Sequence, residues 1–205
     1  TTPDFRQQAL RHDLRRVDAV LYTHTHADHI LGLDELRRYN HLTKRAVPLY
    51  GDAFTLAELQ RVFAYAFDPA GPKGGGVPHL ALHEVDDRPF TIGGQAIVPV
   101  PVRHGQRMIL GYRFGRFAYL TDCNGIPEAS YDRLRDLDVL VLDALRRRPH
   151  PTHFTVDEAL AAAARIGARR TYFTHICHDL AHEATCATLP PGTSLAYDGL
   201  RLEIA

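Results

Sequence analysis

The chain has 205 residues, of which 45% are hydrophobic and 23% charged, an ordinary composition for one globular domain. Its 24 basic and 24 acidic residues balance, which excludes the strong positive field that steers a protein to nucleic acid. No apolar run approaches the length of a membrane span, and three cysteines without a C-x-x-C pair argue against a disulfide framework and favour the cytoplasm.

The first predicted element is a buried strand over residues 17–23, and a histidine cluster follows it in the sequence THTHADH at 23–29. Alternate residues of an extended chain lie on one side, so His24 and His26 can converge on one cation. Asp28 and His29 come after the chain has turned and can bind a second cation. Imidazole and carboxylate ligands suit zinc, manganese or iron. The cluster therefore predicts a site for two metals.

The next elements are a helix over 28–40, a short strand over 47–50 and a second helix over 55–67. Residues 68–78 contain too much glycine and proline for regular structure. This segment is either a lid over a site or a solvated linker between the two halves of the chain.

The second half of the chain is rich in predicted strands. Hairpins are expected at 90–98, turning at Gly93-Gly94, and at 108–121, turning at Gly115. A buried strand over 138–143, an alanine-rich helix over 156–166 and a strand over 170–174 follow. Strands over 194–197 and 200–204, separated by a turn at Asp198-Gly199, close the chain.

Several of these strands run into a ligand-type residue. His104 follows the apolar run at 98–102, Asp122 follows 117–121 and His175 follows 170–174. The carboxyl ends of strands are where sheet-based enzymes commonly assemble their sites. Asp143 ends a buried strand and is a candidate for orienting a ligand histidine. Cys123 follows Asp122 and is expected to point to the opposite face, into the interior.

The order H-x-H-x-D-H, then His, Asp and His, resembles the metallo-β-lactamase superfamily. The resemblance implies an α/β (α+β) fold, the αββα sandwich of two mixed sheets flanked by helices, as a single domain over 1–205. It also implies that N-terminal strands of the domain precede this chain, which does not begin with methionine. Within the superfamily, residues 3–8, 142–146 and Thr174-His175 with His178 resemble the cyclic phosphodiesterase of phosphonate breakdown. The metal motifs are also similar, more distantly, to those of tRNase Z.

Carried over position by position, the resemblance implies two divalent metal ions, zinc or manganese. One would be held by His24, His26 and His104 and the other by Asp28, His29 and His175, with Asp122 bridging them. It also places a proton donor within residues 149–154. His153, 22 residues before His175, matches that position better than the fallback, His150. His153 and Asp28 are the expected catalytic residues.

The leading hypothesis is hydrolysis of a small phosphodiester, cyclic ones included, by a metal-bridging hydroxide with His153 as general acid. The alternatives are another hydrolase of this fold, acting on a thioester, a lactone or the 3′ end of tRNA, or a non-catalytic metal-dependent binding or carrier protein. The expected partner is a small molecule, without nucleic acid or membrane, and a homodimer is left open. His178 and His182, four residues apart, have either a metal or substrate role or a surface role.

Overall fold

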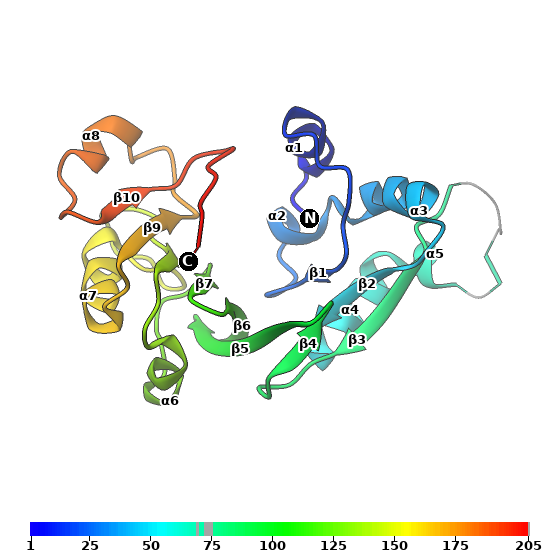
Figure 1. Cartoon of the computed structure of the whole chain (residues 1–205), viewed down its shortest axis with the longest axis horizontal. Helices are drawn as coiled ribbons and strands as arrows, with labels where there is room; N and C mark the ends of the chain where they lie inside the picture. The colour runs from blue at the N-terminus through cyan, green and yellow to red at the C-terminus, as the bar shows by residue number, and fades with distance from the viewer. Residues whose placement is uncertain (69, 72–75, 205) are drawn as a thin grey trace. The chain divides into compact units, whose positions relative to one another are not determined.

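The computed structural model of the chain describes residues 1–68, 70–71 and 76–204 (Figure 1). These residues form two compact units, Thr1–Asp86 and Asp87–Ala205, which are described in turn. Residues 69 and 72–75, which belong to the segment predicted as a lid or linker, lie outside the described residues. Among the helices in the described ranges, none combines the length and the apolar character needed to cross a membrane.

The first unit contains a parallel sheet in the strand order β1-β2-β3, with helix α4 packed against β2 and β3. Its buried core is mainly aliphatic, as with Leu33, Leu36, Leu49 and Leu59. Its elements are α1 (Phe5–Arg11), β1 (Val20–Leu21), α2 (Ala27–Ile30), η1 (Leu33–Leu36), α3 (Arg37–Thr43), β2 (Val47–Gly51), α4 (Ala53–Val62), α5 (Ala64–Phe67) and β3 (Leu80–Glu84).

The strand predicted over 17–23 is much shorter in the structure. Only Val20 and Leu21 pair with β2, in parallel register with Leu49 and Tyr50. Tyr22 makes one more hydrogen bond, to the Tyr50 carbonyl at 2.8 Å. Strand β2 ends at Gly51, so the chain beyond Tyr22 has no strand beside it. The histidine cluster therefore begins where the ladder stops.

The helix predicted over 28–40 is divided into α2, η1 and α3, and the N-terminal residues pack against Gly32 at the break between α2 and η1. The Gly32 amide donates to the Thr1 carbonyl at 2.9 Å. A Cβ at Gly32 would lie 2.1 Å from the Thr2 carbonyl oxygen, so only glycine fits here. The apolar spacing over 28–40 depends only on neighbouring residues, so it could not predict the contact between Gly32 and residues 1–2. Asp28 and His29 consequently lie on a single short turn rather than on a long helix.

The helix predicted over 55–67 is likewise divided, at Phe63, into α4 and α5. Phe63 has φ −109° and ψ 40°, outside the helical region, and its ring is buried in the core of the first unit. Helix α4 begins earlier than predicted because Asp52 caps it, accepting a hydrogen bond from the Thr55 amide at 2.7 Å. The strand predicted over 47–50 is confirmed and includes one more residue.

The second unit contains a seven-stranded mixed sheet in the order β10-β9-β8-β7-β6-β5-β4. Strands β4 to β7 pair in antiparallel fashion, whereas β7 to β10 are parallel neighbours. Its elements are β4 (Phe90–Ile92), β5 (Gln95–His104), β6 (Arg107–Phe114), β7 (Phe117–Leu120), α6 (Glu128–Tyr131), η2 (Asp132–Leu134), β8 (Val139–Asp143), α7 (Val156–Ile166), β9 (Arg170–Thr174), α8 (His182–Cys186) and β10 (Thr193–Leu195).

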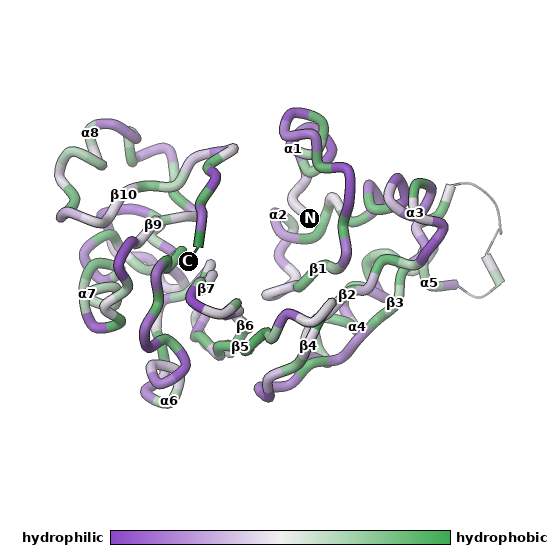
Figure 2. The backbone as a smooth tube through the Cα atoms, viewed as in Figure 1, coloured by the Kyte–Doolittle hydropathy of each residue, from purple (hydrophilic) through white to green (hydrophobic). Residues whose placement is uncertain are grey.

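The core of the second unit lies between this sheet and its helices. All five residues of β8 are buried, and α7 packs against this strand. Figure 2 shows the hydrophobic colouring of β5, which contributes Val100 and Val102 to the core. Both predicted hairpins, the helix over 156–166 and the strand over 170–174 are confirmed.

The strand predicted over 200–204 is wrong. The described residues after Leu195 form no strand, and the chain turns at 198–199 as predicted, with the Leu200 amide donating to the Tyr197 carbonyl at 3.1 Å. The following segment is bound by a side chain instead, because the Arg170 guanidinium donates to the Glu203 carbonyl at 2.8 Å. Strand β10 already pairs with β9, so that edge of β9 is closed to a further strand.

Candidate metal centre

The histidine cluster of the first unit gathers directly after β1. The ring of His24 lies 4.6 Å from that of His26 and 4.3 Å from that of His29, measured between centroids. His26 keeps an extended backbone, with φ −64° and ψ 153°, and α2 begins at the next residue. Within this turn, the Oδ2 atom of Asp28 lies 3.0 Å from Nε2 of the neighbouring His29. The first unit therefore collects three imidazoles and a carboxylate within six residues of chain.

The second unit collects its ligand-type residues at one edge of the sheet. His104 is the last residue of β5, Asp122 follows β7 by two residues and His175 follows β9 by one. Strands β7, β8 and β9 are parallel neighbours, and β5 runs in the same direction because two antiparallel pairings separate it from β7. Their carboxyl ends therefore share an edge.

Distances within this second set match a metal centre. Nε2 of His175 lies 3.4 Å from Oδ2 of Asp122, and the donor atoms of His104 and Asp122 lie within 4.8 Å of each other. Asp122 is 1% exposed, and the Thr121 hydroxyl donates to its other oxygen at 2.5 Å. A carboxylate this deeply buried needs positive charge or hydrogen bonds to stay ionised. A divalent cation would supply that charge.

The backbone is strained at two of these positions. Asp122 has φ 54° and His175 has φ 56°, in the left-handed region that side chains other than glycine rarely adopt. Such conformations cost on the order of 1–3 kcal/mol each and gather at functional sites, where surrounding structure enforces them. Both residues follow their strands at the shared edge of the sheet.

Asp143 is fully buried between two histidines. Its carboxylate lies 3.4 Å from Nδ1 of His153 and 3.5 Å from Nδ1 of His175, and it accepts a hydrogen bond from the Phe154 amide at 3.0 Å. Burial raises the pKa of Asp143 above its ordinary value, and the neighbouring histidines oppose that effect. This carboxylate occupies the Nδ1 side of both rings, so their Nε2 atoms lie on the side away from it. The orienting role predicted for Asp143 agrees with this geometry.

His153 lies inside the second set rather than at its margin. Its ring stacks on that of His175, with centroids 4.6 Å apart and planes 14° apart, and lies 5.0 Å from the ring of His104. It is 8% exposed. The fallback donor, His150, lies 4.9 Å from His153, and burial lowers the pKa of His150.

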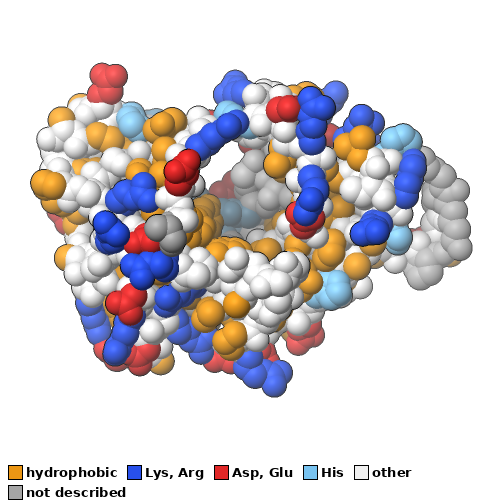
Figure 3. All heavy atoms as spheres, viewed as in Figure 1, with side chains coloured by type: hydrophobic (Ala, Val, Ile, Leu, Met, Phe, Trp, Pro, Cys, Tyr) orange, Lys and Arg blue, Asp and Glu red, His pale blue; other side chains and the backbone are white. Residues whose placement is uncertain are grey.

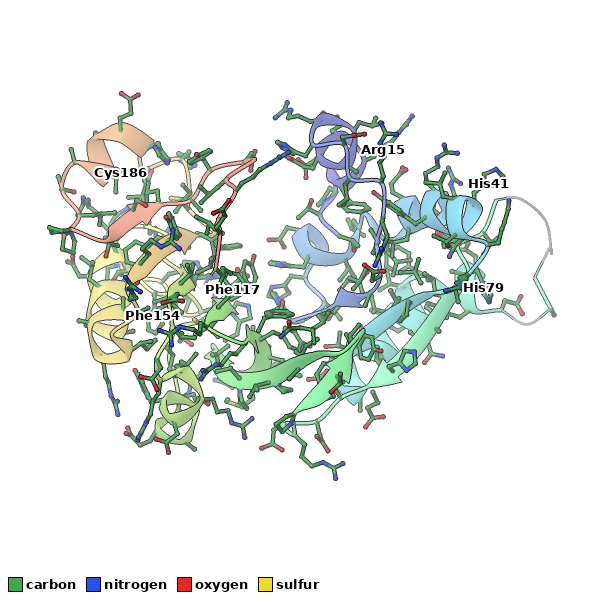
Figure 4. All side chains as sticks on the ribbon, viewed as in Figure 1. Arg15, His41, His79, Phe117, Phe154 and Cys186 are labelled. Carbon is green, nitrogen blue, oxygen red and sulfur yellow. The ribbon has the colours of Figure 1, made fainter. Side chains whose placement is uncertain are left out.

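The loop that carries His153 is attached to the ligand set by its backbone. Nδ1 of His104 lies 2.9 Å from the Thr152 carbonyl, so a ring N–H donates to it and fixes the orientation of the ring. Phe154, labelled in Figure 4, donates its amide to the Cys123 carbonyl at 2.7 Å as well as to Asp143. Sequence patterns missed Thr152 because its contribution is a carbonyl oxygen, which every residue possesses.

The remaining candidates lie apart from this set. The side chain of His178 is 95% exposed, and His182 begins α8, with Nε2 3.2 Å from the Leu195 carbonyl. The two histidines therefore do not lie on one face of a helix, and His178 lies at the surface. Cys123 is fully buried, as predicted, and burial raises the pKa of its thiol. Cys123, Cys177 and Cys186 are all free thiols.

The family of this chain follows from a match to the beta-lactamase superfamily domain, which covers residues 1–176. The chain belongs to this superfamily. Its α/β fold, with helices flanking a mixed sheet, is the metallo-β-lactamase fold predicted from the ligand order. The histidine and aspartate groups of both units have the donor chemistry that a metal-dependent member requires.

Two solved structures are similar to this superfamily member. A diphosphatase of the PhnP family has a TM-score of 0.91 and 48% identity, covering 100% of this chain and 78% of that one. Human tRNase Z, short form, has a TM-score of 0.74 and 18% identity, covering 98% and 85%, which shows a shared fold. Both resemblances inferred from the sequence are thereby confirmed.

A curated relative from Porphyromonas gingivalis, named as an octanoyltransferase, is 36% identical over 202 residues. The match covers 97% of this chain but 40% of the relative, so the chain spans about two fifths of that protein's length. The activity in its name is that of the longer protein.

Proposed function

We propose that the chain is a metal-dependent phosphodiesterase that hydrolyses a small phosphodiester, cyclic ones included. The observation that carries the proposal is the position of His153, a histidine stacked on one candidate ligand and with Nδ1 3.4 Å from the buried carboxylate of Asp143. Hydrolysis of a phosphodiester expels an alkoxide, which needs a proton, whereas a metal site for binding alone needs no such group. The 48% identity to a PhnP-family diphosphatase supports hydrolysis at phosphorus, the coarser part of this proposal.

The metals would be held as the family resemblance implies. His24, His26 and His104 would bind one divalent ion and Asp28, His29 and His175 the other, with Asp122 shared. Zinc and manganese both suit this mixture of imidazole and carboxylate. When bound, such a pair lowers the pKa of bound water and neutralises charge on phosphoryl oxygens. Asp28, as a ligand at this centre, would act in catalysis through its metal.

His153 would supply the proton. With Nδ1 directed at Asp143, the transferable proton sits on Nε2, and the carboxylate stabilises the imidazolium from which it leaves. General acid catalysis of this kind contributes roughly 10²- to 10⁴-fold. His104 and Thr152 fix the loop from which the ring projects.

A small substrate fits the surface better than nucleic acid does. Figure 3 shows basic and acidic side chains interspersed over the visible face of the second unit, in line with the balanced composition. A continuous basic surface, which a phosphate backbone prefers, is not what this face presents. The likeness to tRNase Z supports the fold and does not extend to its RNA substrate.

The competing activities can be separated by one panel of assays on the metal-loaded protein. The substrates are bis(p-nitrophenyl) phosphate, a 2′,3′-cyclic nucleotide, a nucleoside diphosphate ester and an octanoyl thioester, measured beside elemental analysis. We expect turnover of the phosphate esters and two metals per chain. Turnover of the thioester alone would favour the carbonyl chemistry suggested by the octanoyltransferase relative. Two metals with no turnover would favour a binding or carrier protein.

We also propose the cytoplasm as the location, supported by three free cysteines, one of them buried. Their thiols suit a reducing compartment. The oligomeric state, including a homodimer, stays a prediction that sedimentation of the loaded protein would test.

A further inference from the structure

Asn124 links two loops that the proposed mechanism needs. Its Oδ1 atom accepts a hydrogen bond from the Gly105 amide at 3.0 Å, and its Nδ2 atom donates to the Pro151 carbonyl at 2.7 Å. Gly105 is the neighbour of the candidate ligand His104, and Pro151 lies two residues before His153. The backbone amide of Asn124 is also held, donating to the Arg103 carbonyl at 2.8 Å. One amide side chain therefore spans the ligand loop and the proton-donor loop.

The two loops fit closely where Asn124 joins them. Gly105 has φ 63°, and a Cβ there would lie 2.9 Å from Cγ2 of Thr152. The backbone of the His104 turn therefore lies directly against the loop that precedes His153. In addition, a ring N–H of His104 donates to the Thr152 carbonyl at 2.9 Å. The spacing between the rings of His104 and His153, 5.0 Å, is fixed by these contacts together.

We propose that Asn124 is a positioning residue, which sets the place of His153 relative to the metal ligand His104. This inference rests on the proposed function. Asn124 contacts neither ring, so its effect passes through the backbone of Gly105 and Pro151. A displacement of about 1 Å in a catalytic group can cost about 10²-fold in rate. The metals would stay bound, because none of their ligands is removed.

The side chain at 124 must accept and donate at once, which an amide does. Asn124→Asp keeps the size and the acceptor for Gly105, but places a carboxylate oxygen against the Pro151 carbonyl. Two acceptors 2.7 Å apart repel, so the proton-donor loop would lose its contact at Pro151 while the ligand loop keeps its contact with residue 124. The substitution is therefore directed at the position of His153.

A matched control exists in the first unit. Asn40 also joins two segments through one amide, donating to the carbonyls of Arg45 at 2.8 Å and His79 at 2.7 Å and accepting from the His79 amide at 2.9 Å. Asn40→Asp removes two donated hydrogen bonds, against the one that Asn124→Asp removes, and does not touch the loop of His153. A loss of activity caused by general destabilisation would occur in both variants.

The test compares kcat of metal-loaded wild type, Asn124→Asp and Asn40→Asp on a 2′,3′-cyclic nucleotide and on bis(p-nitrophenyl) phosphate. For Asn124→Asp we expect the wild-type metal content, about 10- to 100-fold lower kcat on the cyclic nucleotide and a loss below about threefold on the nitrophenyl ester, whose leaving group needs no proton. For Asn40→Asp we expect wild-type kcat on both. Equal losses on the two substrates, or a loss explained by missing metal, would overturn the proposal.

A second readout does not depend on turnover. Diethyl pyrocarbonate modifies accessible imidazoles, and His153 is 8% exposed, so its modification in wild type should be slow. We expect severalfold faster modification of His153 in Asn124→Asp, read by peptide mass spectrometry, with the rate at exposed His178 unchanged. An unchanged rate at His153 would overturn the positioning role. If wild type hydrolyses no phosphate ester, the proposed function fails, and this labelling still decides the role of Asn124.

Discussion

Nδ1 of His153 and Oδ2 of Asp143 lie 3.4 Å apart, in a part of the second unit where both side chains are buried. The same carboxylate reaches His175, so one aspartate orients both a candidate proton donor and a candidate metal ligand. Removing either partner should therefore have separable effects on proton transfer and on metal binding.

His153→Ala should retain both metals and lose roughly 10²- to 10⁴-fold in kcat on a substrate with an alkoxide leaving group. The loss should be much smaller on bis(p-nitrophenyl) phosphate, because nitrophenolate leaves without a proton. Steady-state kinetics on both substrates measures the difference. His178→Ala, at an exposed site, is the control and should keep wild-type rates. A loss of the same size on both substrates would reject the acid role.

Asp143→Asn should lower kcat by about 10- to 100-fold, because the neutral amide no longer stabilises an imidazolium at His153. As the pH is raised, the variant should also lose activity at a lower pH than wild type does, because without the carboxylate fewer molecules keep the proton on His153. The pH profile and the metal content are measured together with added metal. Full recovery of kcat on adding metal would show that Asp143 acts through His175 alone.

Asp122→Ala should deplete bound metal, since it removes the ligand assigned to both ions, and full occupancy by elemental analysis would contradict that assignment. Asp122→Gly should lose metal equally. Because residue 122 has φ 54°, the metal-free glycine variant should be about 1 kcal/mol more stable than the alanine variant. Denaturant titration in the presence of a chelator measures this difference. Equal stabilities would indicate that the backbone relaxes when the carboxylate is removed.

Asp138 provides a prediction about pH and stability away from the ligands. Its carboxylate is paired with Arg116 at 2.8 and 3.1 Å, and that guanidinium lowers the pKa of Asp138. A lowered folded pKa contributes stability above the unfolded pKa of about 4, and that stability is lost as the pH falls through the folded value.

At pH 7 Asp138→Asn should therefore lower Tm by a few degrees, and its difference from wild type should shrink below about pH 4. Asp132→Asn, in an exposed pair with Arg135, should change Tm little at either pH. Thermal unfolding followed by circular dichroism across this pH range is the measurement. A difference in Tm that stays constant with pH would mean that packing, rather than the ion pair, accounts for the effect.

Local patterns predicted those elements whose ends are also determined locally. Helix α7 begins at the capping box of Thr155 and Glu158 and ends at Gly167, which has φ 71°. Both signals lie within the helix's own sequence, so its bounds were predicted correctly. The prediction of one helix over 28–40 was wrong at Gly32, where the chain packs against the carbonyls of Thr1 and Thr2, some thirty residues away in sequence.

The candidate site divides in the same way. Histidines and aspartates at strand ends are visible in the sequence because ligand chemistry restricts the residue type. The contributions of Thr152 and Asn124 depend on hydrogen bonds between residues 19 to 48 positions apart, and neither residue type predicts such a bond. The left-handed backbone conformation at His175 could not be predicted from the sequence either, since glycine is the residue that usually adopts it.

The two ligand sets differ in how much of the chain must fold before each exists. His24, His26, Asp28 and His29 need little more than one turn, whereas His104, Asp122 and His175 meet once β5, β7 and β9 have joined one sheet. Contacts between distant segments form slowly because a long loop must first close. During folding, the histidines of the first set would thus be able to bind a cation early. Metal binding by the second set would occur only after the seven-stranded sheet has formed.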